Sequence, residues 1–272
     1  MSEDAPAEAF YEPLGGGRFA GSPATAGPWS PGFQHGGPVA GLLGRAFERH
    51  EPVPGGRIAR VTVELLSPVP VAVLDIAVRV VRPGKRVAHL EAEMTHEGRP
   101  VVRATAWRIM EAPAHLEPVV HGPPPPALPA TAEPFPEWPG VHTGGYLSAM
   151  EWRIVHGAFG EPGPGTTWAR SRIPLVAGEA DTPLVRALTL ADSASGIGSQ
   201  LDNAKWLIIN TDMTVGLHRD PAGEWLCMAA SLDLSPGGSA LCEATLADTS
   251  GGFGRALQTL IVDEQASATG GG

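Results

Sequence analysis

The stretch Phe33-Gln34-His35-Gly36-Gly37-Pro38-Val39-Ala40-Gly41 is the part of this sequence from which its fold can be worked out. Two glycines and a proline stand where a helix would begin, and proline is favoured in a first helical turn. Apolar residues then recur at helical spacing, at Val39, Leu42, Leu43, Ala46 and Phe47. We therefore expect a helix over Phe33–His50 with one face buried in a core.

Four strand-like runs follow this helix. Each run alternates apolar with polar or small residues, as Ile76, Val78 and Val80 do, and this alternation is typical of a half-buried strand. Arg82-Pro83-Gly84-Lys85 and Glu97-Gly98-Arg99-Pro100 supply turns between neighbouring strands. The expected strands are Arg57–Leu66, Val73–Arg82, Arg86–His96 and Pro100–Met110.

A proline-rich segment, Glu111–Gly145, separates this first unit from the rest of the chain. Ten prolines lie between Pro113 and Pro139, and residues without an N–H donor cannot continue a helix or a sheet ladder. Organised pattern resumes after it, which argues against a disordered tail within a single domain. We predict an N-terminal unit over residues 1–112, a linker over 113–145 and a C-terminal unit over 146–272.

The second half repeats the order of elements seen in the first. Two strand-like pieces, Glu151–His156 and Thr166–Pro174, lead into a helical stretch from about Leu184 to Leu201. A long helix covered by an antiparallel sheet, made twice, is a route to one continuous core, so we expect an α+β fold. The closing strands are expected at Lys205–His218, Glu224–Leu234, Ala240–Asp248 and Gly254–Val262.

Two short matches at one spacing indicate that the halves arose by duplication. Arg255-Ala256-Leu257-Gln258 is similar to Arg103-Ala104-Thr105-Ala106, and Leu217 corresponds to Leu65, in both cases 152 positions apart. Each match is weak alone, but their common offset favours an internal repeat over coincidence.

Composition limits the classes of function. The 272 residues have a formal net charge of −10, with 43% hydrophobic and 18% charged residues, which is typical of a globular protein. Nucleic acid is disfavoured as a partner, because phosphate binding requires clustered Lys and Arg. G-x-S-x-G, Walker and H-E-x-x-H patterns do not occur, which weakens serine hydrolase, NTPase and zinc protease interpretations.

The cysteines and the apolar stretches indicate where the protein resides. Cys227 and Cys242 lie in apolar, strand-like stretches, so we expect two reduced core thiols, with a disulfide between neighbouring strands as the alternative. Residues 1–17 lack a signal-peptide pattern, and no apolar stretch approaches the roughly 18 residues that span a bilayer. We expect a cytoplasmic protein without a membrane span.

Over roughly Phe19 to Asp263 the chain resembles the double hot-dog acyl-CoA thioesterases, the TesB-like family. The resemblance is carried by the Phe33–Gly41 stretch, His218-Arg219, Glu224-Trp225-Leu226 and the last strand through Gln258. It implies two antiparallel sheets, each wrapped around a central helix and joined edge to edge. It also implies hydrolysis of acyl-CoA, or of an acyl-carrier thioester, without a metal or other cofactor, by a homodimer or larger assembly.

The resemblance also implies a set of site residues. Bacterial members of the family hold the attacking water with an Asp at the start of the second central helix, a Thr or Ser on the next strand and a Gln on the last strand. Asp192, within Ala191-Asp192-Ser193, and Gln258 match the first and third positions. Asn210 stands at the hydroxyl position, a departure from the pattern. Thr211 is the alternative, and because neighbouring strand residues face opposite ways only one can face the site.

These residue types suit thioester hydrolysis. A carboxylate such as Asp192 can act as base or as nucleophile, and the sequence leaves both open. Backbone N–H groups near Ser193, Ala194 and Ser195, at the expected start of the second helix, would form an oxyanion hole. A second group, His35, Gly36 and Gly37, resembles the helix-start motif of single hot-dog thioesterases. We expect it to cap the first helix and to shape a pocket rather than to catalyse.

Each candidate also has a plainer interpretation, and two other functions compete. Asp192 can be only a helix N-cap, and Gln258 and Asn210 can be satisfied core amides. Hydratases of this fold usually place a His five residues after the Asp, where this chain has Ile197. A non-catalytic acyl-CoA or acyl-carrier binding protein is the stronger rival, which the Asn at position 210 favours.

The repeat itself argues for one site per chain. At the offset of 152 residues Gln258 corresponds to Ala106, and Asn210 corresponds to Ile58. The polar candidates therefore occur in one copy only, and we expect a single site in the second half.

Overall fold

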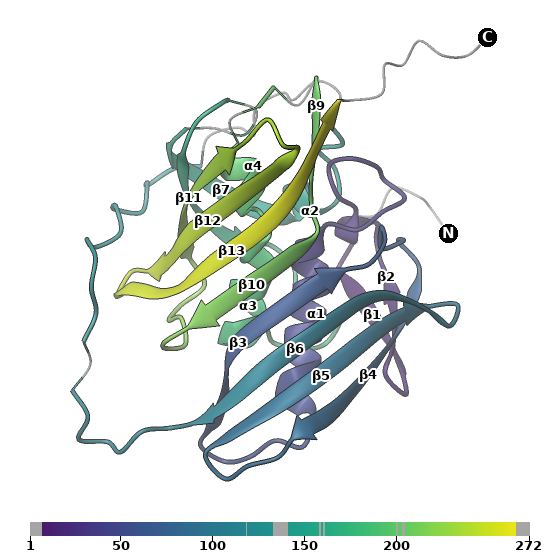
Figure 1. Cartoon of the computed structure of the whole chain (residues 1–272), viewed down its shortest axis with the longest axis vertical. Coiled ribbons are helices and arrows are strands. Elements are labelled where there is room, and N and C mark those ends of the chain that lie inside the picture. The colour runs from purple at the N-terminus through teal and green to yellow at the C-terminus, as the bar shows by residue number, and fades with distance from the viewer. Residues whose placement is uncertain are drawn as a thin grey trace.

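The chain folds into one curved antiparallel sheet with its helices on the concave side (Figure 1). The computed structural model describes residues 7–117, 119–132, 141–157, 159, 161–199, 201–202 and 205–264. Across these residues the strand order is β1-β2-β4-β5-β6-β3-β10-β13-β12-β11-β8-β7, and β9 pairs with β13 beside this path. The expected α+β class is confirmed, and the two expected antiparallel sheets are joined edge to edge through β3 and β10 into one.

The first half contains the predicted helix and its four strands. Its elements are β1 Tyr11–Gly15, β2 Arg18–Gly21, a 3-10 turn at Pro23–Thr25, α1 Gly36–Arg49, β3 Gly56–Leu65, β4 Val73–Arg82, β5 Val87–His96 and β6 Arg99–Met110. The expected helix starts at Gly36 rather than Phe33, because the side chain of His35 caps it by accepting the N–H of Gly37. β1 and β2 were not expected, since two short strands rich in glycine and proline show no alternation.

The second half follows the same plan with more interruptions. Its elements are α2 Tyr146–Ala149, β7 Met150–His156, β8 Gly165–Ser171, α3 Pro183–Ala191, α4 Ala194–Ile197, β9 Trp206–Asn210, β10 Asp212–Leu217, β11 Leu226–Leu234, β12 Ser239–Asp248 and β13 Gly251–Glu264. The single helix expected from Leu184 to Leu201 is wrong, because α3 stops at Ala191 and only one further turn, α4, follows. The single strand expected over Lys205–His218 is likewise divided at Thr211.

The duplication predicted from the sequence appears as a pseudo-twofold arrangement of strands. β3 and β10 pair at the centre of the sheet, where Thr62 lies opposite Thr214 and their hydroxyls are 3.0 Å apart. These two positions differ by 214 − 62 = 152, so equivalent residues of the two halves meet each other here. The neighbouring pairs agree, since Val63 opposite Ala104 is repeated as Val215 opposite Ala256.

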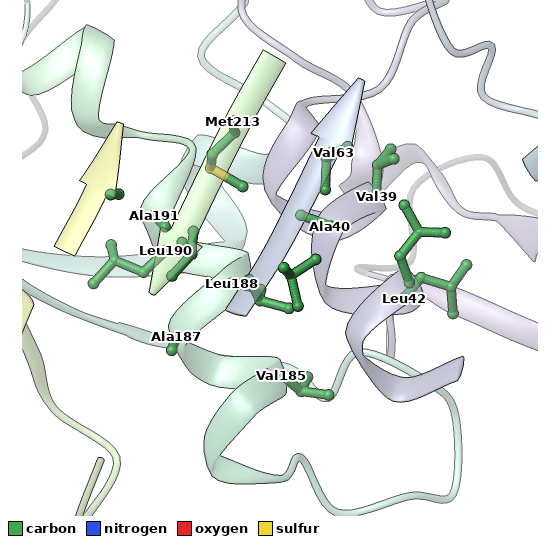
Figure 2. Packing of buried hydrophobic residues seen from close by; sticks show 14 of the residues in the cluster. Val39, Ala40, Leu42, Val63, Val185, Ala187, Leu188, Leu190, Ala191 and Met213 are labelled. Atoms are coloured by element: carbon green, nitrogen blue, oxygen red, sulfur yellow. The ribbon is translucent and has the colours of Figure 1, made fainter. Parts of the chain in front are cut away.

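One core fills the concave side of both halves. Figure 2 shows Val39, Ala40 and Leu42 of α1 in the same cluster as Val185 and Leu188 of α3. Val63 of β3 and Met213 of β10 close this cluster from the sheet side. The two helices therefore pack against each other as well as against the sheet, and the halves share their interior.

The proline-rich segment lies against the second half. The carbonyl of Pro126 accepts a hydrogen bond from the Trp168 indole, and that of Pro129 accepts one from Arg153. Leu128 packs with Trp168 in a small cluster apart from the main core. Residues 133–140 of this segment, together with 1–6 and 265–272 at the ends of the predicted units, lie outside the described residues.

Candidate active site

A cavity of about 340 Å³ opens where the two halves meet. Its walls come from the start of α1 and the loops around it in the first half, and from the α3–α4 junction and β9 in the second. Trp29 and Phe33 are partly exposed at this cavity, whereas Val69, Phe159 and Ile208 are buried in its wall. The catalytic candidates were all expected in the second half, but the cavity that Asp192 and Asn210 border is formed by both halves.

Asp192 lies in the cavity wall at the end of α3. It is 6% exposed, and its Oδ1 accepts hydrogen bonds from Asn210 Nδ2 at 2.7 Å and from Gln258 Nε2 at 3.2 Å. The expectation that Asp192 starts the second helix, or caps its N-terminus, is wrong: it caps the C-terminus of α3. Asp192 and Ser193 keep nearly helical backbone angles, so the sequence pattern runs through this break without showing it.

Asp192 does lie at a helix N-terminus, but at that of α1 from the first half. A Cβ atom added to Gly36 would lie 2.7 Å from both carboxylate oxygens of Asp192, so only glycine allows this approach. The partial positive charge at a helix N-terminus favours an ionised carboxylate there. Of the motif expected to cap the first helix, His35 and Gly36 thus also form one wall of the site, whereas Gly37 does not line the cavity.

Gln258 is completely buried behind Asp192 and does not reach the cavity. Its Nε2 donates to the carboxylate and to the backbone carbonyl of Asp192, both at 3.2 Å. Its Oε1 accepts the N–H of Ser195 at 3.1 Å. The amide therefore joins β13 to the α3–α4 junction and fixes the orientation of Asp192.

The structure distinguishes between the two candidates at the hydroxyl position. Asn210 is the last residue of β9 and donates to Asp192. Thr211 also borders the cavity, but its hydroxyl has its acceptors elsewhere, with the carbonyl of Thr259 at 3.2 Å and the carboxylate of Asp212 at 3.3 Å. Asn210 is therefore the residue that meets Asp192, as the alignment with the family pattern indicated.

The expected oxyanion donors at Ser193–Ser195 are largely occupied. The N–H of Ser193 donates to the carbonyl of Leu190, and that of Ser195 to Gln258. Ala194 is buried and does not line the cavity. Gly36 offers a better donor, because it lines the cavity and an N–H in the first turn of a helix has no acceptor within that helix.

Two features of the site were not expected from the sequence. Tyr146 stacks on the His35 ring with centroids 3.8 Å apart and planes at 12°, and its hydroxyl donates to Thr189 O and contacts Ser193 Oγ. His35 Nδ1 lies 3.1 Å from Asp192 Oδ2. Burial lowers the pKa of His35, and the nearby Asp192 opposes this shift. Tyr146 begins a four-residue helix, which is too short to produce a periodic pattern.

The described residues also bear on metal binding and on membrane-spanning helices. Among them, no group of three or more His, Cys, Asp or Glu side chains is arranged to hold a metal ion. Nor does any helix of this part of the chain have the length and apolar character needed to cross a membrane.

Comparisons with known proteins match both halves of the chain to one family. The family model for the acyl-CoA thioesterase N-terminal domain matches residues 25–109, and the one for the acyl-CoA thioesterase C-terminal domain matches residues 124–262. No curated protein matches the chain. These two matches lie in the same order as the two halves of the structure.

Several solved structures share the fold at low sequence identity. A hot-dog protein from Alicyclobacillus acidocaldarius is 20% identical, with a TM-score of 0.68 over 94% of this chain and 96% of that chain. The tesB protein of Mycobacterium avium subspecies paratuberculosis is 18% identical, with a TM-score of 0.64 over 93% and 96%. An acyl-CoA thioesterase II from Mycobacterium marinum is 16% identical, with a TM-score of 0.66 over 96% and 97%.

Proposed function

This chain belongs to the acyl-CoA thioesterase family and is a thioester hydrolase, and we propose that it hydrolyses acyl-CoA with a water molecule activated by Asp192. One observation carries the proposal. Asp192 borders the shared cavity with Oδ1 bonded to Asn210 and Gln258, Oδ2 3.1 Å from His35 Nδ1, and both oxygens against the N-terminus of α1. The carboxylate is thus held in one orientation beside the space that an acyl thioester would occupy.

The reaction proceeds in two steps. The water oxygen attacks the thioester carbon while its proton passes to Asp192, and the carbonyl π electrons move to the carbonyl oxygen. The N–H of Gly36 donates to this oxyanion. The oxyanion then re-forms the carbonyl as the C–S bond breaks with its electron pair on sulfur, and the proton held at Asp192 passes to the coenzyme A thiolate. Asn210 and Gln258 do not react, because both hold the carboxylate.

The acyl group is expected to be apolar and uncharged. Among the described lining residues, His35 and Asp192 are the ionisable ones, and most of the surface that the cavity exposes is apolar, although serines and amides also contribute to it. An apolar cavity of about 150 Å³ holds benzene, so about 340 Å³ accommodates on the order of twelve carbon atoms. Medium-length acyl chains fit this volume, and the charged nucleotide of coenzyme A would lie outside it.

Release of free thiol from a panel of acyl-CoA esters tests the proposal. Asp192→Ala is expected to lower kcat by about 10²–10⁴-fold, the usual contribution of a general base. Gln258→Ala is expected to lower kcat as well, since it leaves the carboxylate free to turn. Asp212→Ala is the matched control, because this nearby carboxylate contacts Thr211 and not Asp192, Asn210 or Gln258. Equal activity in Asp192→Ala and in the control would rule out Asp192 as the base.

The departure at position 210 keeps one other function in view. An amide in place of the family's hydroxyl is what a non-catalytic acyl-CoA or acyl-carrier binding protein would tolerate. Such a protein would bind a non-hydrolysable acyl-CoA tightly and release no thiol from acyl-CoA or acyl-carrier substrates. Asn210→Thr separates the hydrolase from the binding protein, because the hydrolase is expected to keep its activity in this variant.

We further propose that the protein is cytoplasmic and assembles as a homodimer or a larger oligomer. Light scattering measures its assembly.

A further inference from the structure

The contact between His35 and Asp192 joins the two halves at the site. His35 Nδ1 is 3.1 Å from Asp192 Oδ2 and also accepts the N–H of Gly37 at 3.0 Å. A neutral imidazole has one N–H and one acceptor nitrogen, and the bond made by one nitrogen determines where the proton resides. The capping bond from Gly37 therefore makes Nδ1 the acceptor and leaves the ring proton on Nε2.

This tautomer makes the contact incomplete while Asp192 is ionised. The one lone pair of Nδ1 then accepts the N–H of Gly37, and no proton lies between Nδ1 and Oδ2, which are 3.1 Å apart. Both side-chain amides of the cluster, Asn210 and Gln258, donate to Oδ1. Oδ2 is thus the oxygen open to a proton, and a proton arriving there forms a hydrogen bond to Nδ1, whose lone pair is then shared between this proton and the N–H of Gly37.

The surroundings keep both groups in place. The His35 ring is fixed by stacking on Tyr146, whose hydroxyl is bonded to Thr189 and Ser193. Tyr146 from α2 and Cys242 from β12 are the described titratable groups that face the pair from the elements around it. Burial raises the pKa of Tyr146 and raises that of Cys242 to about 12, so both remain protonated at neutral pH. Burial lowers the pKa of His35, so the ring remains neutral there.

We propose that His35 and Asp192 accept the proton of the attacking water as one pair, with the proton shared between Oδ2 and Nδ1. The inference rests on the proposed hydrolytic function and adds a positioning residue from the first half. The proton leaves the water as the new C–O bond forms and occupies the Oδ2–Nδ1 contact. It then passes to the thiolate when the C–S bond breaks, while the proton on Nε2 stays in place.

Two variants separate this role from the structural roles of His35. His35→Asn keeps an acceptor for the N–H of Gly37, because Asn is a good N-cap, but has no imidazole. His35→Phe keeps an aromatic ring to stack on Tyr146 but has no acceptor. Both are expected to lower kcat about 100-fold with little change in KM, in line with the contribution of acid–base groups. The acid limb of the kcat/KM profile is expected to move to lower pH in both.

The contrary outcomes are specific. Wild-type kcat and pH profile in His35→Asn would reduce His35 to a helix cap, and the same result in His35→Phe would reduce it to a stacking partner. Thermal unfolding of both variants, followed by circular dichroism, shows whether the fold is intact.

A measurement on the resting wild-type protein makes the inference independent of turnover. Nitrogen NMR of ¹⁵N-histidine-labelled protein distinguishes the two tautomers, and the signal missing from His35→Asn identifies His35. We expect a neutral ring at pH 7 with its proton on Nε2, and a changed Nδ1 shift in Asp192→Asn. A proton on Nδ1, or a Nδ1 shift indifferent to Asp192→Asn, would overturn the pairing even if the enzyme is active. Absence of thiol release with the expected Nδ1 shift would instead count against the hydrolase proposal.

Discussion

Asp248 is a buried carboxylate whose charge is matched by its neighbours. Its side chain is fully buried at the β12–β13 hairpin, where it accepts two bonds from the guanidinium of Arg219 and the N–H groups of Ala222 and Ser250. Burial raises the pKa of Asp248, but these donors outweigh it, so the pKa lies below its ordinary value. His218-Arg219 was quoted from the sequence as a family feature, and its use is to hold this hairpin to β10.

Asp248→Ala is therefore expected to lower the free energy of unfolding by about 3 kcal/mol at pH 7, because it leaves Arg219 without its partner. A carboxyl whose pKa is lower in the folded than in the unfolded protein stabilises the fold in full at pH values above its unfolded-state pKa of about 3.9. This stabilisation is lost as the pH falls through the folded-state pKa. Urea unfolding at pH 7 and near pH 3 measures the difference. Asp75→Ala, which breaks the exposed pair with Arg18, is the control and should cost less than about 1 kcal/mol. If wild type and Asp248→Ala differed as much in free energy of unfolding near pH 3 as at pH 7, this explanation would be contradicted.

Single site residues were predictable where a family pattern marked them, and not where the fold alone brings them together. Asp192, Asn210 and Gln258 were identified by their order along the chain, and the structure brings them within hydrogen-bonding distance. The contact between His35 and Asp192 joins residues 157 positions apart, 192 − 35, and depends on how two helices are placed. No local pattern carries that information.

The spacing between α1 and α3 is set by glycines on α1. A Cβ on Gly37 would lie 2.3 Å from the backbone carbonyl of Thr189, whereas one on Gly44 would lie 2.4 Å from the end of the Leu188 side chain. A backbone atom cannot move aside without shifting the helix, but a leucine methyl can rotate away. The two positions thus differ in what an added methyl group would displace.

Alanine at these positions should have unequal effects. Gly37→Ala is expected to reduce stability by about 1–3 kcal/mol, as overpacking does, and to lower kcat because α1 moves relative to Asp192. Gly44→Ala is expected to be near neutral, since the helix propensity gained, up to about 1 kcal/mol, offsets the strain. Urea unfolding and thiol release on both variants measure this. Equal losses of stability and kcat in the two variants would show that the spacing between α1 and α3 does not determine the effect of the added methyl group.

Substitutions of Ile208 on β9 test whether the cavity determines the preferred length of the acyl chain. It lies two residues before Asn210, so both side chains face the same side of the strand. Ile208→Ala should raise kcat/KM for longer over shorter chains by roughly 10-fold, and Ile208→Phe should lower it similarly, since one methylene in an apolar pocket is worth about that much. Ile261→Ala, on the exposed neighbouring position of β13, is the control. An unchanged preference in all three would place the acyl chain elsewhere.

Strands and helices were predictable to different degrees for physical reasons. Alternation located β4 at its observed bounds, because a half-buried strand must show it. The breaks at Asp192 and Thr211 escaped prediction, because each side of the break keeps the pattern of its neighbour. In the repeat, Thr211 corresponds to Ala59, since 211 − 59 = 152, and the pairing of β3 with β6 shifts register at that point. The interruption thus belongs to the plan of both halves.

The shared interior predicts how the whole chain unfolds. Leu90 of β5 and Leu246 of β12 are fully buried, belong to opposite halves and lie in the same core. Leu90→Ala and Leu246→Ala are each expected to destabilise by about 2–5 kcal/mol and to shift one common transition. Urea unfolding followed in parallel by tryptophan fluorescence and by thiol-release activity measures this. Two separable transitions, each sensitive to one variant, would show that the halves unfold independently.

The meeting of Thr62 with Thr214 has a consequence for how this site came to be asymmetric. In an ancestral homodimer of single units, the same threonine from each subunit would have met its copy, and every mutation would have altered both sites together. Fusion of the two units into one chain would remove that constraint. One copy could then retain the helix start that receives the carboxylate, and the other the carboxylate itself, while the second site decayed without loss to the first.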